Sequence, residues 1–340
     1  MADQMLAAVF EGEGRLSLKD VDVPQVRAAD DVLLAVRAAG ICGTDVHILS
    51  VPPGHPASPG VILGHEYTAE VLRSGERVNH VKPSDRVVID PSVWCGSCAY
   101  CQRGLTNLCD RMEGIGIVRD GGFAAFSVVP ARAVYKISPE VAPEIAALAE
   151  PLADVLSGVR KLQPTPGDSA LVLGAGPIGL LYTLLLRAAG ATPLIVAEIS
   201  EYRAARARAC GADLVVNPRE EDLAASVRRA TGLGADLVVD AVGTLLEEGV
   251  RAVRRGGRVL LFGMNEHARP VLKQFDVTKY EYQILGSYIA RGTFPPAVSL
   301  LERGRIDFEP LLTHRLPLRE IHHGIELLRR GQALKIAVMP

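Results

Sequence analysis

The sequence predicts an α/β protein in which a mainly β part precedes a doubly wound parallel sheet. From about residue 168 onwards, short apolar runs alternate with longer helical patterns, which is the rhythm of strands joined by helices. Before that point, short extended segments are separated by Gly, Pro and Asp, and long helical periods are rare. With 340 residues, 48% of them hydrophobic, the chain is long enough for about two domains.

The first part of the chain is predicted to consist mostly of strands. Apolar or alternating runs bounded by turn residues indicate strands at residues 7–10, 16–19, 32–36, 86–89 and 126–129. A helical pattern follows at residues 143–162. Residues 164–168, Pro-Thr-Pro-Gly-Asp, then have the composition of a turn between domains, and the helix before them fits either domain.

The second part alternates between strands and helices. Strands are expected at residues 170–173, 194–197, 214–216, 237–239 and 259–262, with helices at residues 178–189 and 203–210. Parallel strands that are covered on both faces read as continuous apolar runs, as these do. The pattern therefore favours a doubly wound parallel sheet.

Charge and composition exclude several partners. The 37 basic and 39 acidic residues are mixed along the chain and give a net charge of −2, so no basic stripe is present to bind nucleic acid. Asp3 stands where a signal peptide would be basic, and no apolar run approaches the roughly 20 residues that span a bilayer. We expect a cytoplasmic protein without a membrane partner. In such a reducing compartment, four cysteines within fifteen residues indicate a metal rather than disulfides.

A glycine pattern follows the first strand of the second part. Gly174, Gly176 and Gly179 form Gly-x-Gly-x-x-Gly between a strand and a helix, where glycine permits a tight turn and the close approach of a pyrophosphate. The next strand ends at Glu198, whose carboxylate would accept hydrogen bonds from ribose hydroxyls and repel a 2′-phosphate. This favours NAD over NADP, although Arg203 could turn towards a phosphate. The alternative is a tight structural turn beside a solvated glutamate.

Four cysteines form a compact lobe. Cys95, Cys98, Cys101 and Cys109 provide four thiolates, which close tetrahedrally on Zn²⁺ and leave no position for substrate. The spacing thus predicts a structural zinc site. An iron–sulfur cluster is the competing interpretation, because its binding loops also use closely spaced cysteines.

A second group of possible ligands lies earlier in the chain. Cys42, His65 and Glu66 offer a thiolate, an imidazole and a carboxylate, a set that leaves a zinc coordination position open. We expect a catalytic rather than a structural metal here. Taken singly, a buried cysteine is usually part of the core, and a histidine beside a glutamate is usually a surface pair or a hydrogen-bonded pair.

Taken in order, the motifs resemble those of the medium-chain, zinc-containing alcohol dehydrogenase superfamily, especially its sorbitol or polyol dehydrogenase branch. The resemblance covers essentially the whole chain. It rests on Gly-Ile-Cys-Gly-Thr-Asp at residues 40–45, Gly-His-Glu at 64–66, the cysteine lobe, Asp-Gly-Gly-Phe at 120–123, Glu-Pro-Leu at 150–152 and the glycine pattern at 174–179.

The resemblance implies a particular domain arrangement. Residues 1–150 and 290–340 would form a GroES-like, mainly β catalytic domain, and residues 151–289 would form an inserted Rossmann domain. It also implies two zinc ions per chain, a small-molecule alcohol or ketone as substrate, and a homotetramer or homodimer.

The resemblance further implies roles for individual residues. Cys42 and His65 would bind the catalytic zinc, and either Glu66 or Glu150 would complete its ligands. Asp45 would orient the zinc-binding imidazole, and Thr44 and His47 would relay the substrate proton. The implied cofactor contacts are Gly174, Gly176, Ile178, Gly179, Glu198, Arg203, Val242 and Gly263. Cys210, at a helix end, is expected to be core packing.

These features predict oxidation of a secondary alcohol on a polyol, sugar alcohol, cyclitol or aminocyclitol. Ile48 and Ile289 stand where sorbitol dehydrogenases have tyrosine and arginine, so linear hexitols fit less well. An L-threonine 3-dehydrogenase is the alternative within the family, although residues 90–94 lack the histidine that precedes the cysteine lobe in those enzymes. A cofactor-binding redox sensor without zinc chemistry is the non-enzymatic alternative.

Overall fold

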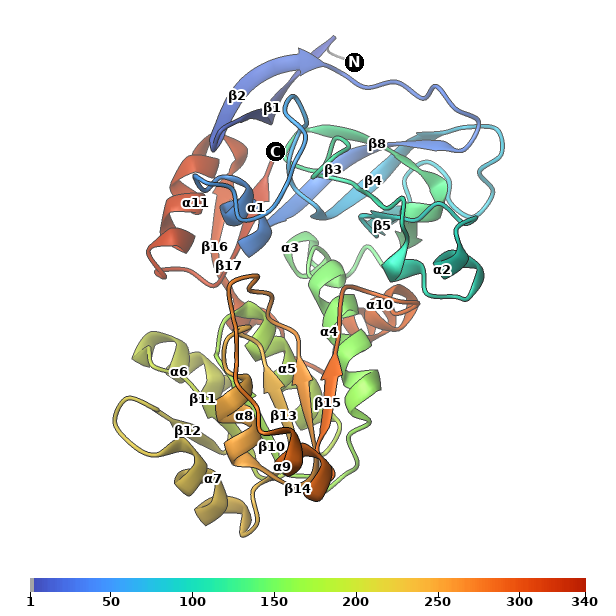
Figure 1. The fold of residues 1–340 in the computed structure, drawn as a ribbon. Coiled ribbons are helices and arrows are strands. Elements are labelled where there is room, and N and C mark those ends of the chain that lie inside the picture. The colour runs from blue at the N-terminus through green and yellow to red at the C-terminus, as the bar shows by residue number, and fades with distance from the viewer. Residues whose placement is uncertain (1–2) are drawn as a thin grey trace. The chain divides into compact units, whose positions relative to one another are not determined.

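The computed structural model describes residues 3–340, which divide into two compact units. One unit contains the chain up to Ala153 together with Ala290–Pro340, and the other contains Asp154–Ile289. Figure 1 shows a mainly β unit and a unit of parallel strands flanked by helices. This confirms the predicted fold class, an α/β protein with a mainly β part and a doubly wound parallel sheet. No helix within residues 3–340 is long and apolar enough to cross a membrane.

The first unit is built on a seven-stranded sheet in the order β16-β17-β3-β4-β5-β9, with β8 also paired to β3. The strands are β3 (Asp31–Ile41), β4 (Glu66–Ser74), β5 (Arg86–Ile89), β8 (Phe126–Pro130), β9 (Val134–Lys136), β16 (Leu312–Pro317) and β17 (Lys335–Met339). All neighbours are antiparallel except β16 and β17. The C-terminal strand β17 thus pairs with β3, near the start of the chain.

Shorter elements complete this unit. They are the hairpin β1 (Gln4–Gly12) and β2 (Arg15–Asp22), the pair β6 (Ser92–Val93) and β7 (Glu113–Gly114), and the helices α1 (Gly43–Ile48), α2 (Ala99–Gln102), α3 (Pro143–Ala146), α10 (Phe294–Arg303) and α11 (Ile321–Arg329). The core is a continuous cluster of aliphatic and aromatic side chains from the sheet, the hairpin and α11.

The second unit contains a six-stranded parallel sheet in the order β12-β11-β10-β13-β14-β15. Its strands are β10 (Ala170–Leu173), β11 (Leu194–Ala197), β12 (Leu214–Val216), β13 (Ala235–Asp240), β14 (Val253–Leu261) and β15 (Gln283–Gly286). Its helices are α5 (Pro177–Ala188), α6 (Glu201–Ala209), α7 (Leu223–Thr231), α8 (Leu246–Ala252) and α9 (Gln274–Lys279). The strand order reverses at β10, which places the glycine pattern at the switch point of the sheet.

The predicted helix at residues 143–162 is two helices. The second, α4, spans Ala149–Leu162, and the division between the units falls within it. The first ends because the Leu148 N–H bonds to the carbonyl of Ile145, three residues back, rather than to the carbonyl four residues back. Cys210 caps the end of α6 and is buried, as expected of a core cysteine.

Candidate functional site

Cys42 lies where strand β3 passes into helix α1. It is the N-cap residue of the helix, and its backbone N–H donates a 2.8 Å hydrogen bond to Oδ2 of Asp45. An acid at the third helical position that reaches back to the N-cap satisfies a donor that the helix itself cannot satisfy. The sequence Cys-Gly-Thr-Asp therefore fixes both the thiol and the buried carboxylate.

His65 and Glu66 are positioned by the residue before them and by the strand after them. Gly64 has φ +94°, and a Cβ there would collide with Phe123, so only glycine suits this position. Glu66 begins β4 and pairs with Gly40 of β3, two residues before Cys42. This register brings the ligand atoms of Cys42, His65 and Glu66 within 4.8 Å of one another.

The chemistry of this group fits a divalent metal. Burial raises the pKa of the Cys42 thiol, and the neighbouring carboxylate of Glu66 raises it further. A thiolate at this position therefore needs a compensating cation, which a zinc ion supplies. The set of one sulfur, one imidazole and one carboxylate is that of an open zinc site.

Glu150 lies near this group without belonging to it. Its charge contributes to the pKa of both Cys42 and His65, which places its carboxylate close by. Among the described residues, the set of ligand atoms within 4.8 Å contains Glu66 and not Glu150.

Thr44 and His47 belong to helix α1, which follows Cys42. Oγ1 of Thr44 lies 3.7 Å from the sulfur of Cys42. His47, three residues further along, is exposed, and the Gly54 N–H donates a 2.9 Å hydrogen bond to its carbonyl. Residues three apart share a helix face, so a hydroxyl and an imidazole line one side of α1.

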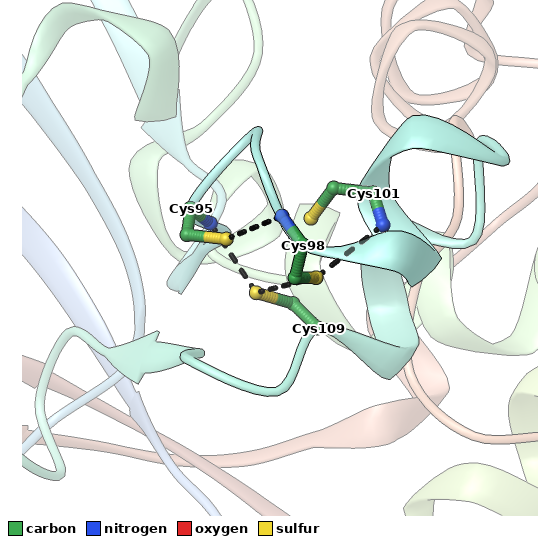
Figure 2. Close-up of side chains that lie close together, drawn as sticks. All are labelled: Cys95, Cys98, Cys101 and Cys109. Carbon is green, nitrogen blue, oxygen red and sulfur yellow. Dashed lines mark hydrogen bonds between the residues drawn. The ribbon is translucent and has the colours of Figure 1, made fainter.

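The four cysteines of the lobe face one another (Figure 2). All four are free thiols whose sulfur atoms lie within 4.8 Å of one another, and those of Cys98 and Cys109 are 3.9 Å apart. Four Zn–S bonds of about 2.3 Å directed tetrahedrally place sulfur atoms about 3.8 Å apart. In an iron–sulfur cluster the four thiolates bind to two or four different irons, so sulfur atoms on different irons lie further apart. The geometry thus favours a single zinc ion.

Backbone N–H groups stabilise the negative charge of a thiolate in the cysteine lobe. The N–H groups of Ser97 and Cys98 donate to the sulfur of Cys95 and lower the pKa of its thiol to about 5. Burial instead raises the pKa of Cys101 to about 12. A metal ion would hold both as thiolates.

The glycine pattern forms the turn between β10 and α5. Gly174 has φ +91°, and a Cβ on Gly179 would collide with the carbonyl oxygen of Gly174. Gly176 is the N-cap residue of α5, and Ile178 lies in the first turn of that helix. The turn thereby directs the start of α5 to the carboxyl edge of the sheet, where backbone N–H groups are free to meet a phosphate.

Glu198 follows β11 beside this turn. Its Oε2 accepts a 2.8 Å hydrogen bond from the Ala175 N–H, and its Oε1 accepts bonds of 2.9 Å from the Ile199 and Ser200 N–H groups. A carboxylate has about four acceptor positions, so one remains on Oε2 for a ligand hydroxyl. Arg203 lies in α6, within the same unit.

The loops after β13 and β14 meet each other. A Cβ on Gly263 would come within 2.8 Å of Cα of Gly243, and one on Gly174 would come within 2.7 Å of Val242. Asp240, which no sequence motif singled out, accepts hydrogen bonds from the N–H groups of Val242 and Gly243 and so shapes this turn. The position of Asp240, an acid at the end of the buried strand β13, was the sequence signal that could have identified it.

Comparisons with known proteins agree with this geometry. The profile of the alcohol dehydrogenase GroES-like domain matches residues 28–139, and that of zinc-binding dehydrogenases matches residues 177–303. An L-threonine 3-dehydrogenase from Pyrococcus furiosus is 34% identical over 100% of this chain and 99% of its own. A D-altritol 5-dehydrogenase from Agrobacterium fabrum is 37% identical over 93% of this chain and 94% of its own.

Two solved structures have the same fold. A zinc-binding dehydrogenase from Sinorhizobium meliloti, bound to NADP, superposes with a TM-score of 0.94 at 33% identity and 100% coverage of both chains. An alcohol dehydrogenase from Escherichia coli CFT073, in complex with NADH, superposes with a TM-score of 0.92 at 31% identity, also over the whole of both chains.

Proposed function

The chain belongs to the zinc-containing alcohol dehydrogenase family and is an alcohol dehydrogenase, and we propose that it oxidises a secondary alcohol of a polyol, sugar alcohol or cyclitol to a ketone with NAD as hydride acceptor. The observation that carries this proposal is the grouping of Cys42, His65 and Glu66 within 4.8 Å. These residues would hold the catalytic zinc, with Glu150 as a further carboxylate nearby. When bound there, zinc supplies a Lewis acid that lowers the pKa of the substrate hydroxyl.

Thr44 and His47 would carry the substrate proton away. The Thr44 hydroxyl lies beside the Cys42 sulfur, and the exposed imidazole of His47 lies one helical turn further on. A hydroxyl can accept a proton while donating its own, and a histidine can exchange the proton with solvent near neutral pH.

NAD is favoured over NADP because of Glu198. Three backbone N–H groups fix its carboxylate, so it cannot easily turn away from a 2′-phosphate that it repels. The similar proteins were solved with either cofactor, so this preference rests on Glu198 alone.

A polyol or cyclitol is the preferred substrate class. The D-altritol 5-dehydrogenase shares 37% identity with the chain. Residues 90–94 also lack the histidine that precedes the cysteine lobe in threonine dehydrogenases, which favours a polyol or cyclitol over threonine. L-threonine is the second candidate, favoured by the 34% identity to a threonine dehydrogenase over the whole chain. The side chain of Ile48 is fully buried in the first unit, so substrate contacts must come from other positions. We further propose a homotetramer or homodimer, which light scattering would test.

The deciding experiment measures NADH formation at mildly alkaline pH. The panel contains sorbitol, xylitol, arabinitol, myo- and scyllo-inositol, an aminocyclitol, L-threonine and 2,3-butanediol, with NADP in place of NAD and a chelator as controls. A chelator-sensitive signal on one polyol or cyclitol supports the proposal. Activity on threonine alone moves the assignment to the second candidate, and silence on every substrate contradicts both.

A further inference from the structure

A buried lysine contacts the carboxylate of the catalytic metal group. Nζ of Lys335 lies 2.8 Å from Oε1 and 2.5 Å from Oε2 of Glu66. The two side chains are only 4% and 1% exposed. Removing two charges from water is costly, and replacing such a pair with apolar side chains is often neutral or stabilising. Stability is therefore a weak explanation for the pair, and a role in the site is the better one.

Rigid elements hold both partners in place. Lys335 lies on β17, an inner strand between β16 and β3, and Thr313 accepts a hydrogen bond from the Leu334 N–H and donates one to the Lys335 carbonyl. The backbone of β3 also lies against the carboxylate, because a Cβ on Gly40 would collide with Oε2 of Glu66. The lysine and the backbone of β3 thereby both restrict the carboxylate.

Lys335 also counters an excess of negative charge. Of the charged groups that act most strongly on Cys42, three are the acids Glu66, Asp45 and Glu150, and the fourth is Lys335. Three carboxylates and a thiolate around one divalent cation would leave the centre negative. Such a centre would hold its metal tightly but would withdraw little charge from a substrate oxygen.

We propose that Lys335 is a positioning residue that acts on the catalytic metal through Glu66. By holding both carboxylate oxygens, it prevents Glu66 from giving the metal a full, uncompensated charge, and so keeps the centre electron-poor. The inference rests on the proposed function, because it takes Cys42 and His65 to hold a metal ion.

This role predicts an effect opposite in sign to that of structural damage. If Lys335 merely supported the fold, its removal would loosen the site and the metal would be lost faster. If Lys335 restrains Glu66, its removal leaves the Glu66 carboxylate with its full charge. Glu66 then binds the metal more strongly, and the metal is lost more slowly although turnover falls.

The test uses the full-length protein with cobalt(II) in the catalytic site. We expect Lys335→Met to lose cobalt to a chelator about tenfold more slowly than wild type, the scale typical of residues that support metal ligands. Its visible absorption bands should change as Glu66 binds the metal more strongly, and kcat should fall. Lys335→Arg keeps the positive charge and should retain the wild-type rate of cobalt loss and the wild-type absorption bands. In a Glu66→Gln background, Lys335→Met should no longer slow the loss of cobalt.

Controls separate the possible failures. Lys136→Met removes an exposed lysine of the same unit, paired with Asp85, and should leave the cobalt spectrum unchanged. If Lys335→Met does not fold, Lys335→Gln decides, because its amide still donates to Glu66 without charge and should also slow the loss of cobalt. Unchanged or faster loss of cobalt with an unchanged spectrum overturns the role of Lys335. Failure of wild type to take up cobalt at Cys42 and His65 overturns the proposed function itself.

Discussion

Nδ1 of His65 lies 3.6 Å from Oδ1 of Asp45, and both side chains are buried. Neither atom has a hydrogen-bond partner within residues 3–340. The other oxygen of Asp45 accepts the Cys42 N–H, so one carboxylate faces two residues of the metal group. With Nδ1 turned towards the carboxylate, Nε2 of His65 is left for the metal. A shortening of this contact to hydrogen-bond distance would let the carboxylate fix the tautomer and raise the basicity of a metal-binding imidazole.

Asp45→Asn should weaken the catalytic site without unfolding it. The amide oxygen can still accept the Cys42 N–H, but the negative charge beside His65 is lost. We expect the affinity for the catalytic metal or kcat to fall by about 10- to 100-fold. Metal competition assays and steady-state kinetics would measure the two effects. Wild-type values for both would mean that the 3.6 Å contact does not support the imidazole.

The two cysteine groups should fail in different ways. Cys42→Ala should lower the zinc content by about one ion per chain and abolish turnover while the fold stays largely intact. A Lewis acid contributes several kcal/mol, so activity should fall by at least about a thousandfold. Zinc analysis, circular dichroism and kinetics check this together.

Cys98→Ala should also lower the zinc content by about one ion per chain, but its main effect should be on stability. The melting temperature should fall, and the loop that carries the lobe should become sensitive to protease. Near-normal turnover in Cys42→Ala, or an unchanged melting temperature in Cys98→Ala, would show that the roles of the two sites are misassigned.

Glu198→Gln should weaken the discrimination between NAD and NADP. The amide oxygen retains one acceptor for the backbone N–H groups, while the charge that repels a 2′-phosphate disappears. We expect the ratio of kcat/KM for NAD over NADP to fall by at least about tenfold. Glu201→Gln is the matched control, because its side chain is 80% exposed and paired with Arg208. Equal ratios in both variants would remove Glu198 from cofactor selection.

The sequence was most informative where structure and chemistry are set locally. The glycine pattern predicted the turn between β10 and α5. The predicted bounds of β10 and of the next strand, β11, agree with the observed ones. Strand β3 was predicted only at residues 32–36 but extends over Asp31–Ile41. Its end contains Arg37 and Gly40, which have weak strand propensity, and pairing with β4 and β17 outweighs that propensity.

Long-range pairing explains what the sequence could not supply. Cys42, His65 and Glu66 were proposed from their residue types, and the register of β3 with β4 brings them together. Lys335 could not be found, because it meets Glu66 across 269 residues through the pairing of β17 with β3. A lone lysine in an apolar C-terminal strand carries no local signal of that contact.

Gly158→Ala should destabilise the second unit. A Cβ at this position would collide with the hydroxyl of Tyr182 and come within 2.9 Å of Leu260. Overpacking of this kind costs about 1–3 kcal/mol, although alanine recovers up to about 1 kcal/mol in helix propensity. Chemical denaturation monitored by circular dichroism would measure the net loss. Gly286→Ala is the control, because a Cβ there meets open space.

Tyr182→Phe tests the same contact from the other side. The Tyr182 hydroxyl is buried and has no hydrogen-bond partner within residues 3–340. Removing a buried, unsatisfied hydroxyl should be neutral or stabilising by about 1 kcal/mol. In the Tyr182→Phe background, Gly158→Ala should cost less than it does in wild type, because the colliding oxygen is gone. Equal costs in the two backgrounds would show that Leu260 or the ring of residue 182, rather than the Tyr182 hydroxyl, requires glycine at position 158.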